Sequence, residues 1–316
     1  MKNLSLLAAT LLFVACGDSD LDGYQNGENI LQASANASDT EALEPNNDEA
    51  RFDYIAVLSD THIVLEDDDH AKNLRAIGET LAQIPLPIKG AFIGGDIVFN
   101  LPYHTIEEYH SDPNDRFDIA QAILDDFPVP YYVAIGNHDM AIDLGVPRLM
   151  TEQLFMEHFG AAPYYTVDLG IWKFIILNNF HGPTMDPNHV DYDVQTGSLG
   201  EEQRKWLRRQ LNDGRPAILM SHFAPFIIND ISDIFEEYRE NIRLFLAGHT
   251  HGWVNMSNHF GVPSMIIGSS QFDADSFMIM ELDNKLGTWR VIDWHRLYWG
   301  SSHAKPWDDS WLPDQD

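Results

Sequence analysis

Side chains that commonly bind metal ions follow five short apolar runs of this sequence. They comprise two carboxylates, one amide and four imidazoles: Asp60, His62, Asp96, Asn137, His222, His249 and His251. A mixture of oxygen and nitrogen donors without a thiolate suits Mn, Fe, Zn, Co or Ni. Seven donors are more than one tetrahedral zinc ion needs, so the set predicts two divalent transition metal ions.

The spacing of these donors favours pairs that face one cleft. Residues i and i+2 of an extended chain point the same way, so Asp60 can act with His62 and His249 with His251. Asp96 stands alone and could bridge two ions about 3.5–4 Å apart. Taken singly, each histidine has an ordinary explanation as a packed or exposed residue. Glycines beside the donors would let the backbone turn sharply and leave room for ions: Gly94, Gly95, Gly136 and Gly248.

The apolar runs that precede the donors predict the elements that position them. The runs FDYIAVL, IKGAFI, PYYVAI, AILM and RLFLA are typical of strands covered on both faces. Helices are predicted between them at about 70–83, 115–126, 151–159 and 200–211, the last with Ser198 as its cap. Strand and helix in alternation indicate an α/β fold, in which ligands bind beyond the carboxyl ends of the strands. Later runs, SMIIGSS, SFMIMELD and TWRVIDWHRLYW, predict further strands, and the alternation in the last one predicts an antiparallel part of a second sheet.

Taken together, these blocks resemble the calcineurin-like metallophosphoesterases in order and spacing. The blocks are DTH at 60–62, GD at 95–96, GNHD at 136–139, His222, and GHTH at 248–251. The resemblance spans Tyr54 to His251. It implies an α/β fold in four layers, a sandwich of two facing mixed sheets with helices outside, and a dinuclear metal site at the carboxyl ends of the strands.

The resemblance also implies a role for each residue. Asp60, His62, Asp96 and His251 would hold one metal, and Asp96, Asn137, His222 and His249 the other, with Asp96 and a water or hydroxide as bridges. The implied reaction is hydrolysis of a phosphate ester by metal-activated water. His138 would be catalytic, protonating the leaving alkoxide or steadying the charge of the phosphoryl group.

Two residues depart from the pattern of many relatives. Where an aspartate and an arginine often follow the bridging aspartate, this sequence has Phe99 and Asn100. The acid that often orients the catalytic histidine and an arginine that clamps phosphate are both absent at these positions. The sequence therefore leaves open what orients His138.

The first fifty residues predict export. Residues 1–16 contain one lysine and a short apolar stretch, and they end at Cys16, the only cysteine of the chain. They resemble a bacterial lipoprotein signal peptide, which predicts a membrane anchor through lipidated Cys16 and an exported location. An ordinary secretory signal is the alternative. Residues 17–50 are acidic without a basic residue, which is typical of a disordered tether. The metallophosphoesterase domain is then 51–316.

The charge of the chain narrows the class of substrate. It has 49 acidic against 19 basic residues, a formal net charge of -30, so a nucleic-acid polymer is not an expected partner. A small phosphate ester is expected instead. The compact length and the DTH and GHTH blocks resemble phosphodiesterase-type members. Two alternatives remain: a phosphomonoesterase of the same fold, and a non-catalytic surface binding lipoprotein that retains the fold. Nothing in the sequence indicates an oligomeric state.

Overall fold

The computed structural model describes residues 51–292 except 102 and 253. All of them belong to one compact unit, Pro45–Asp316. The signal peptide predicted at 1–16 and the tether predicted at 17–50 lie outside the described residues. None of the helices in the described ranges is long and apolar enough to cross a bilayer.

From β1 to β4, the first strand of the second sheet, strands alternate with helices along the described chain. The strands are β1 (Phe52–Leu58), β2 (Ile88–Ile93), β3 (Tyr131–Val133), β4 (Tyr165–Leu169), β5 (Trp172–Ile176), β6 (Ala217–Ser221), β7 (Ile242–Ala247), β8 (Val254–His259), β9 (Val262–Ile266), β10 (Met278–Asp283) and β11 (Thr288–Val291). The α-helices are α2 (Asp69–Leu81), α3 (Ile106–His110), α4 (Arg116–Asp125), α5 (Asn137–Met140), α6 (Arg148–Phe159), α7 (Gly200–Leu211) and α8 (Ser232–Tyr238). Three short 3-10 helices are η1 (Ile142–Leu144), η2 (Pro183–Met185) and η3 (Pro225–Ile227).

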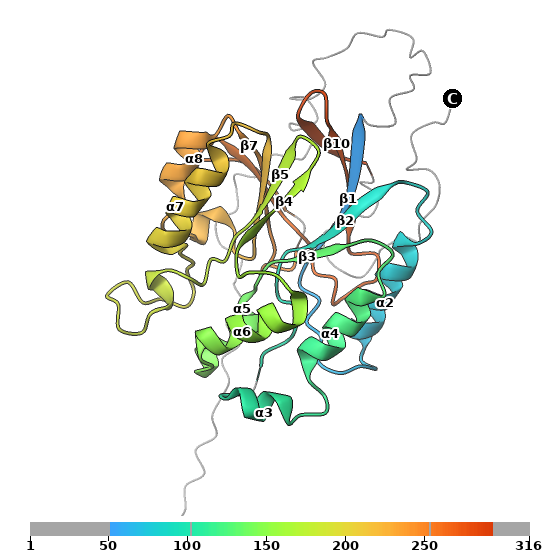
Figure 1. The fold of residues 1–316 in the computed structure, drawn as a ribbon, viewed down its shortest axis with the longest axis vertical. Helices are drawn as coiled ribbons and strands as arrows, with labels where there is room; N and C mark the ends of the chain where they lie inside the picture. Colours follow the sequence, from blue (N-terminus) through green and yellow to red (C-terminus); the bar gives the residue numbers. More distant parts are fainter. Residues whose placement is uncertain (1–50, 102, 253, 293–316) are drawn as a thin grey trace, which may run out of the picture. The chain divides into compact units, whose positions relative to one another are not determined.

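The strands form two mixed sheets. The first has the order β11-β10-β1-β2-β3 and the second the order β4-β5-β6-β7-β9-β8. The central strands of each sheet are parallel, and helices such as α2 and α7 connect them (Figure 1). The antiparallel strands lie toward the edges. This arrangement confirms the predicted α/β class with two mixed sheets.

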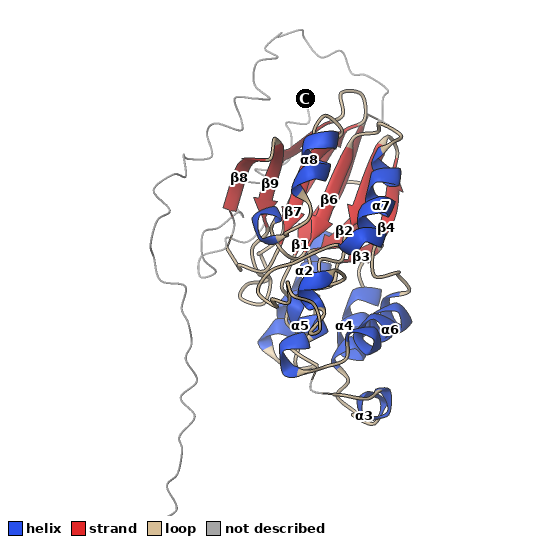
Figure 2. Cartoon of the chain, turned by 90° about the vertical axis from the view of Figure 1, so that its left-hand side faces the viewer, coloured by secondary structure: helices blue, strands red, loops and turns tan. Residues whose placement is uncertain are grey.

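Alternate side chains of each central strand enter two different cores, which places one sheet against the other. In β1, Ile55 and Val57 belong to the core between the sheets, while Ala56 belongs to the core beneath the helices. Phe92 of β2 and Phe174 of β5 stack across the gap with ring centroids 4.2 Å apart. Because strand side chains alternate in direction, a strand that is apolar throughout must be covered on both faces. Figure 2 shows α7 and α8 on the outer face of the second sheet.

The predicted cap of the helix at 200–211 is wrong. Leu199 is the residue that precedes helix α7, and its side chain does not cap the helix. Ser198 is buried and its hydroxyl bonds that of Thr184 at 2.7 Å. The carboxylate of Asp230, from a distant segment, accepts from the amides of Leu199 and Gly200 at 2.8 and 3.0 Å. A full negative charge there complements the helix dipole better than a hydroxyl does.

The last strands are also distributed differently from the prediction. SMIIGSS begins within β9, which pairs in the second sheet with β7 in parallel and with β8 antiparallel. The next two runs contain β10 and β11, which extend the first sheet beside β1, with Met280 opposite Ile55; the last run beyond 292 lies outside the described residues. Met278, Met280 and Leu282 thereby fill the core between the sheets. A strand's apolar pattern predicts that it is buried but does not identify its neighbour.

Candidate metal centre

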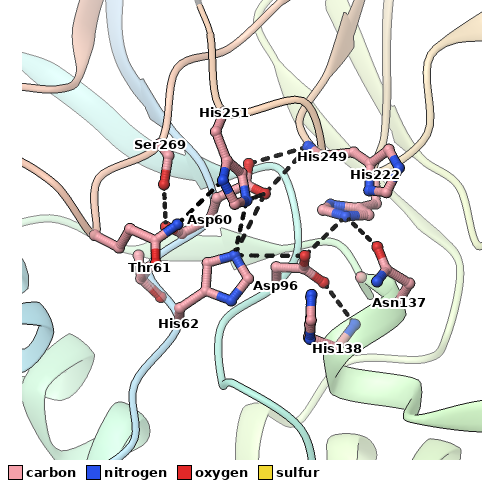
Figure 3. Close-up of polar contacts among 12 residues, drawn as sticks. Asp60, Thr61, His62, Asp96, Asn137, His138, His222, His249, His251 and Ser269 are labelled. Atoms are coloured by element: carbon pink, nitrogen blue, oxygen red, sulfur yellow. Dashed lines mark hydrogen bonds and ion pairs between the residues drawn. The ribbon is translucent and has the colours of Figure 1, made fainter. Parts of the chain in front are cut away.

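The seven predicted metal ligands meet where the carboxyl ends of both sheets converge (Figure 3). Asp60 and His62 follow β1, Asp96 follows β2, and Asn137 follows β3, all in the first sheet. The second sheet contributes the other three after β6 and β7: His222, His249 and His251. The site therefore depends on the packing of the two sheets as well as on each sheet by itself.

Most of these residues have an unusual backbone. Eight described residues other than glycine have positive φ, and five of them are predicted ligands: Asp60, His62, Asp96, His249 and His251. Left-handed backbone outside glycine costs free energy and concentrates at functional sites. Among the glycines beside them, a side chain at Gly136 would collide with Asp96, and one at Gly248 with Asp60 and Ser59. A side chain at either position would push the neighbouring carboxylate out of place, so glycine is required at both.

One group of four side chains surrounds a single point. His62 Nε2 lies 3.1 Å from His251 Nε2 and 3.6 Å from the Oδ2 of Asp96. His251 Nε2 lies 3.4 Å from Asp60 Oδ1. One donor atom from each of the four residues lies within 4.8 Å of all the others. Two imidazoles and two carboxylates at these distances could hold one metal ion.

A second group shares Asp96 with the first. His222 Nε2 lies 3.1 Å from Asp96 Oδ2 and 3.0 Å from the amide oxygen of Asn137. His249 completes the group within 4.8 Å. The Nδ1 of His222 donates to the carbonyl of Gly94 at 2.9 Å. Because Nδ1 donates to this carbonyl, Nε2 is the nitrogen that faces the two oxygens, as in imidazoles that bind metals.

The two oxygens of Asp96 differ in a way that fits a bridge between cations. Oδ1 accepts from the backbone N–H of His138 at 2.8 Å. Oδ2 is buried, lies toward both His62 and His222, and has no hydrogen-bond partner among the described residues. A buried carboxylate oxygen without a donor is costly unless a positive charge faces it. The residues present therefore fit two metal ions that share Asp96.

The pKa values of the buried groups also point to positive charge at this site. Burial raises the pKa of Asp60, but hydrogen bonds from His251 and His62 outweigh burial and hold it below its usual range. Burial likewise raises the pKa of Asp96, and the neighbouring His222 lowers it overall. Both carboxylates thus keep their negative charge although they are fully buried. Cations must compensate them, either protons on the imidazoles or metal ions.

The pKa values of the two histidines in the second group, His222 and His249, are shifted in opposite directions. Burial lowers the pKa of His222, but the charges of Asp96 and Asp60 raise it to about 9. Burial, and next the repulsion from His222, lower the pKa of His249 to about 4. His249 is therefore neutral at pH 7 and offers a lone pair. His222, in contrast, carries a proton at pH 7 and faces Asp96 through Nε2. A metal ion bound between Nε2 and Asp96 can replace that proton.

Asn100 supplies the contact to His138 that the sequence left open. Its amide oxygen lies 2.6 Å from His138 Nδ1, and the ring of Phe99 stacks on that of His138 with centroids 4.8 Å apart. Asn100 has φ 57°, a conformation that asparagine tolerates better than most residues. Arg116 binds the carbonyls of both residues and holds this turn in place. The side-chain amide of Asn100 thus makes the contact to His138 that an acid would otherwise make. No motif in the sequence indicated this contact.

Asp139 is a second residue whose role the sequence did not reveal. Its Oδ1 accepts from the amide of Val98 at 2.9 Å, and its Oδ2 accepts from that of Gly136 at 2.8 Å. The side chain thereby ties the loop after β2 to the loop after β3. Burial, and next the charge of Asp96, raise the pKa of Asp139 to about 7. Its place within GNHD was the only signal in the sequence.

Other polar residues considered from the sequence lie outside the two groups. His104 and His110 are exposed. His181 is partly buried and contacts Arg148 and Glu152 rather than the predicted ligands. The segment 186–193 is exposed throughout.

The fold and the site together define a two-sheet α/β protein with a candidate dinuclear metal centre. A family model described as calcineurin-like phosphoesterase matches residues 54–253, so the chain belongs to that family. The resemblance found from the motifs is thereby confirmed. No curated protein sequence matches the chain.

Solved structures with a similar fold include a dimetal phosphatase from Danio rerio. It is 14% identical, with a TM-score of 0.51, over 72% of this chain and 91% of that one. A purple acid phosphatase from yellow lupin, Lupinus luteus, is also 14% identical, with a TM-score of 0.48, over 81% of this chain and 57% of that one. At such identities the likeness concerns the fold alone.

Proposed function

We propose that the protein is a metal-dependent phosphoric ester hydrolase that acts on phosphodiesters. The family and the two residue groups support a hydrolase with a dinuclear site. The observation that carries the proposal is the position of Asp96 Oδ2, which lies 3.6 Å from His62 Nε2 and 3.1 Å from His222 Nε2 and has no hydrogen-bond partner among the described residues. We assign Asp60, His62, Asp96 and His251 to one ion, and Asp96, Asn137, His222 and His249 to the other.

The side chains around the centre would position the ester and move protons. Two divalent ions at such a site supply an activated water and neutralise phosphoryl oxygens. Asp60 accepts from the amide of His249 at 3.1 Å, which fixes the loop after β7 against the loop after β1. His138 donates from Nδ1 to Asn100, so its proton would reach the leaving oxygen through Nε2. The role of His138 is thus general acid.

The charge of the site favours a diester over a monoester. A monoester dianion carries one more negative charge than a diester, and the chain has a net charge of -30. The pocket beside Asn137 and His249 contains no lysine or arginine in its lining. With few basic side chains available, the smaller substrate charge costs less to bind.

Turnover of two chromogenic esters tests this proposal. We expect metal-loaded protein to hydrolyse bis(p-nitrophenyl) phosphate with a higher kcat/KM than p-nitrophenyl phosphate. A higher value for the monoester would reverse the assignment to a phosphomonoesterase. Protein that binds no transition metal after anaerobic reconstitution and hydrolyses neither ester would be the non-catalytic binding protein instead.

We also propose that the protein is exported and anchored to a membrane through lipidated Cys16. The support is the apolar stretch that ends at the only cysteine of the chain. We expect labelled palmitate to enter the wild-type protein and not the Cys16→Ser variant. Equal labelling of both, or of neither, would contradict the anchor.

A further inference from the structure

A small pocket opens beside the second residue group of the candidate metal centre. Asn137 and His249, two of the proposed ligands, form one of its walls. Its volume is about 60 Å³. The remaining lining is apolar apart from one glutamine: Met140, Ile142, Phe180, Met185, Val194, Phe223 and Gln195. The pocket is thus continuous with the place where the phosphoryl group of a substrate would lie.

The inner wall of the pocket is buried and aromatic. Phe180 and Phe223 are each 1% exposed and meet edge to face with centroids 4.9 Å apart. The ring of Phe223 also lies 4.5 Å from that of His249. Met140, which also lines the pocket, is fully buried. Such a wall contributes apolar contact next to a ligand without needing to rearrange.

The outer wall comes from the loop between β5 and α7, which is tied down at several points. Met185 and Val194 lie on this loop, and the amide of Asp193 donates to the carbonyl of Thr184 at 2.9 Å. The amide of Gly197 donates to the carbonyl of Ile227 at 2.7 Å. Because the backbone is bonded on both sides of Val194, the loop forms a fixed wall. The pocket is therefore preformed.

We propose that this pocket receives a compact apolar group of the phosphate ester, about three carbon atoms in size. This inference rests on the proposed function and specifies its substrate. A charged group there would lose its hydration without gaining a lysine, arginine or carboxylate partner in the lining. An apolar group would be removed from water by Phe180, Phe223 and Val194. The ester would then be selected by its apolar substituent while the metal centre binds its phosphoryl group.

Two phosphonates that differ only in the apolar group test the proposal without turnover. We expect manganese-loaded protein to bind propylphosphonate about tenfold more tightly than methylphosphonate, because two more methylene groups are buried. The Kd values would be measured by calorimetry. Val194→Ser should reduce the ratio to about threefold, since it removes part of the outer wall.

Val190→Ser is a matched control on the same loop. Val190 is 93% exposed and does not line the pocket, so this variant should keep the tenfold ratio. Equal Kd values for the two phosphonates in the wild type would overturn the pocket assignment, as would an equal loss of the ratio in both variants. A tenfold ratio in a protein that hydrolyses no ester would leave the pocket in place and overturn the proposed function. Binding of neither phosphonate would overturn both.

Discussion

Two clusters of aspartate and histidine in this protein look alike by proximity but differ in their hydrogen bonds and backbone conformation. One is the candidate metal centre. The other, which we call the α4–α6 cluster, consists of Asp115, Asp118 and His158, and its donor atoms also lie within 4.8 Å of one another. Both clusters have buried members.

The α4–α6 cluster is explained by hydrogen bonds. His158 Nε2 lies 2.9 Å from Asp118 Oδ1, and its Nδ1 donates to the carbonyl of Leu154 at 2.7 Å. Asp115 accepts from the hydroxyl of Tyr109 and caps helix α4 through two backbone amides. None of its three members has positive φ. An ion pair and a helix cap thus account for the whole cluster.

The metal centre is not explained in this way. Asp96 Oδ2 is buried between His62 Nε2 and His222 Nε2 without a hydrogen-bond partner among the described residues. Five of the seven proposed ligands have left-handed backbone. Strain and orphaned polar atoms each cost free energy, so their coincidence indicates a function that compensates them. Proximity of ligand types is therefore weaker evidence for a metal than unsatisfied atoms on strained backbone.

The largest expected effect follows from the substitution of Asp96, the residue shared by both groups. Asp96→Asn keeps an oxygen that can accept from the amide of His138 but removes the bridging charge. We expect kcat/KM for bis(p-nitrophenyl) phosphate to fall more than about 100-fold and both metals to be lost. Metal content would be measured by mass spectrometry of the purified protein.

The same change in the α4–α6 cluster provides the control. Asp118 has a side chain that is 68% exposed, and Asp118→Asn should leave metal content and turnover unchanged. If Asp96→Asn retained both metals and full turnover, the bridge would be wrongly assigned. If Asp118→Asn lost a metal ion, the contrast between the two clusters would fail.

An intermediate effect is expected from Asn100, which would act on the proposed reaction by positioning His138. Asn100→Gly removes the hydrogen bond to Nδ1 while glycine accepts the φ of 57°. We expect kcat to fall about 10- to 100-fold with unchanged metal content. Asn100→Asp restores an acceptor at the same position and should recover most of the activity. An equal loss in both variants, or a loss of metal, would show that Asn100 does not position His138.

The smallest effect on activity is expected from His158. His158→Phe keeps a ring that packs beside Phe117 but removes the contacts to Asp118 and Leu154. We expect the free energy of unfolding to fall by about 1–3 kcal/mol, measured by urea denaturation, with turnover unchanged. A loss of turnover without a loss of stability would mean that the α4–α6 cluster has a chemical role.

Much of the site was predictable because its ligands follow strands directly. Parallel strands align their carboxyl ends, so Asp60 and Asp96 had to lie near each other once both runs were assigned to one sheet. The cap of α7 was not predictable, because Asp230 comes from a segment thirty residues away. Sequence periodicity also failed to place β10 beside β1, since apolar alternation predicts burial without naming the neighbouring strand.

The sequence by itself determined the family, the α/β class and the residue types that gather at the strand ends. It did so because those properties depend on motifs and apolar runs, which are formed by residues close together in the sequence. Only the tertiary structure decided that Asp96 turns a buried oxygen toward both groups and that Asn100 reaches His138. The apolar pocket beside His249 likewise required the loop between β5 and α7 to lie next to Asn137 and His249. Such contacts join residues far apart in sequence, and only the packing of the two sheets brings them together.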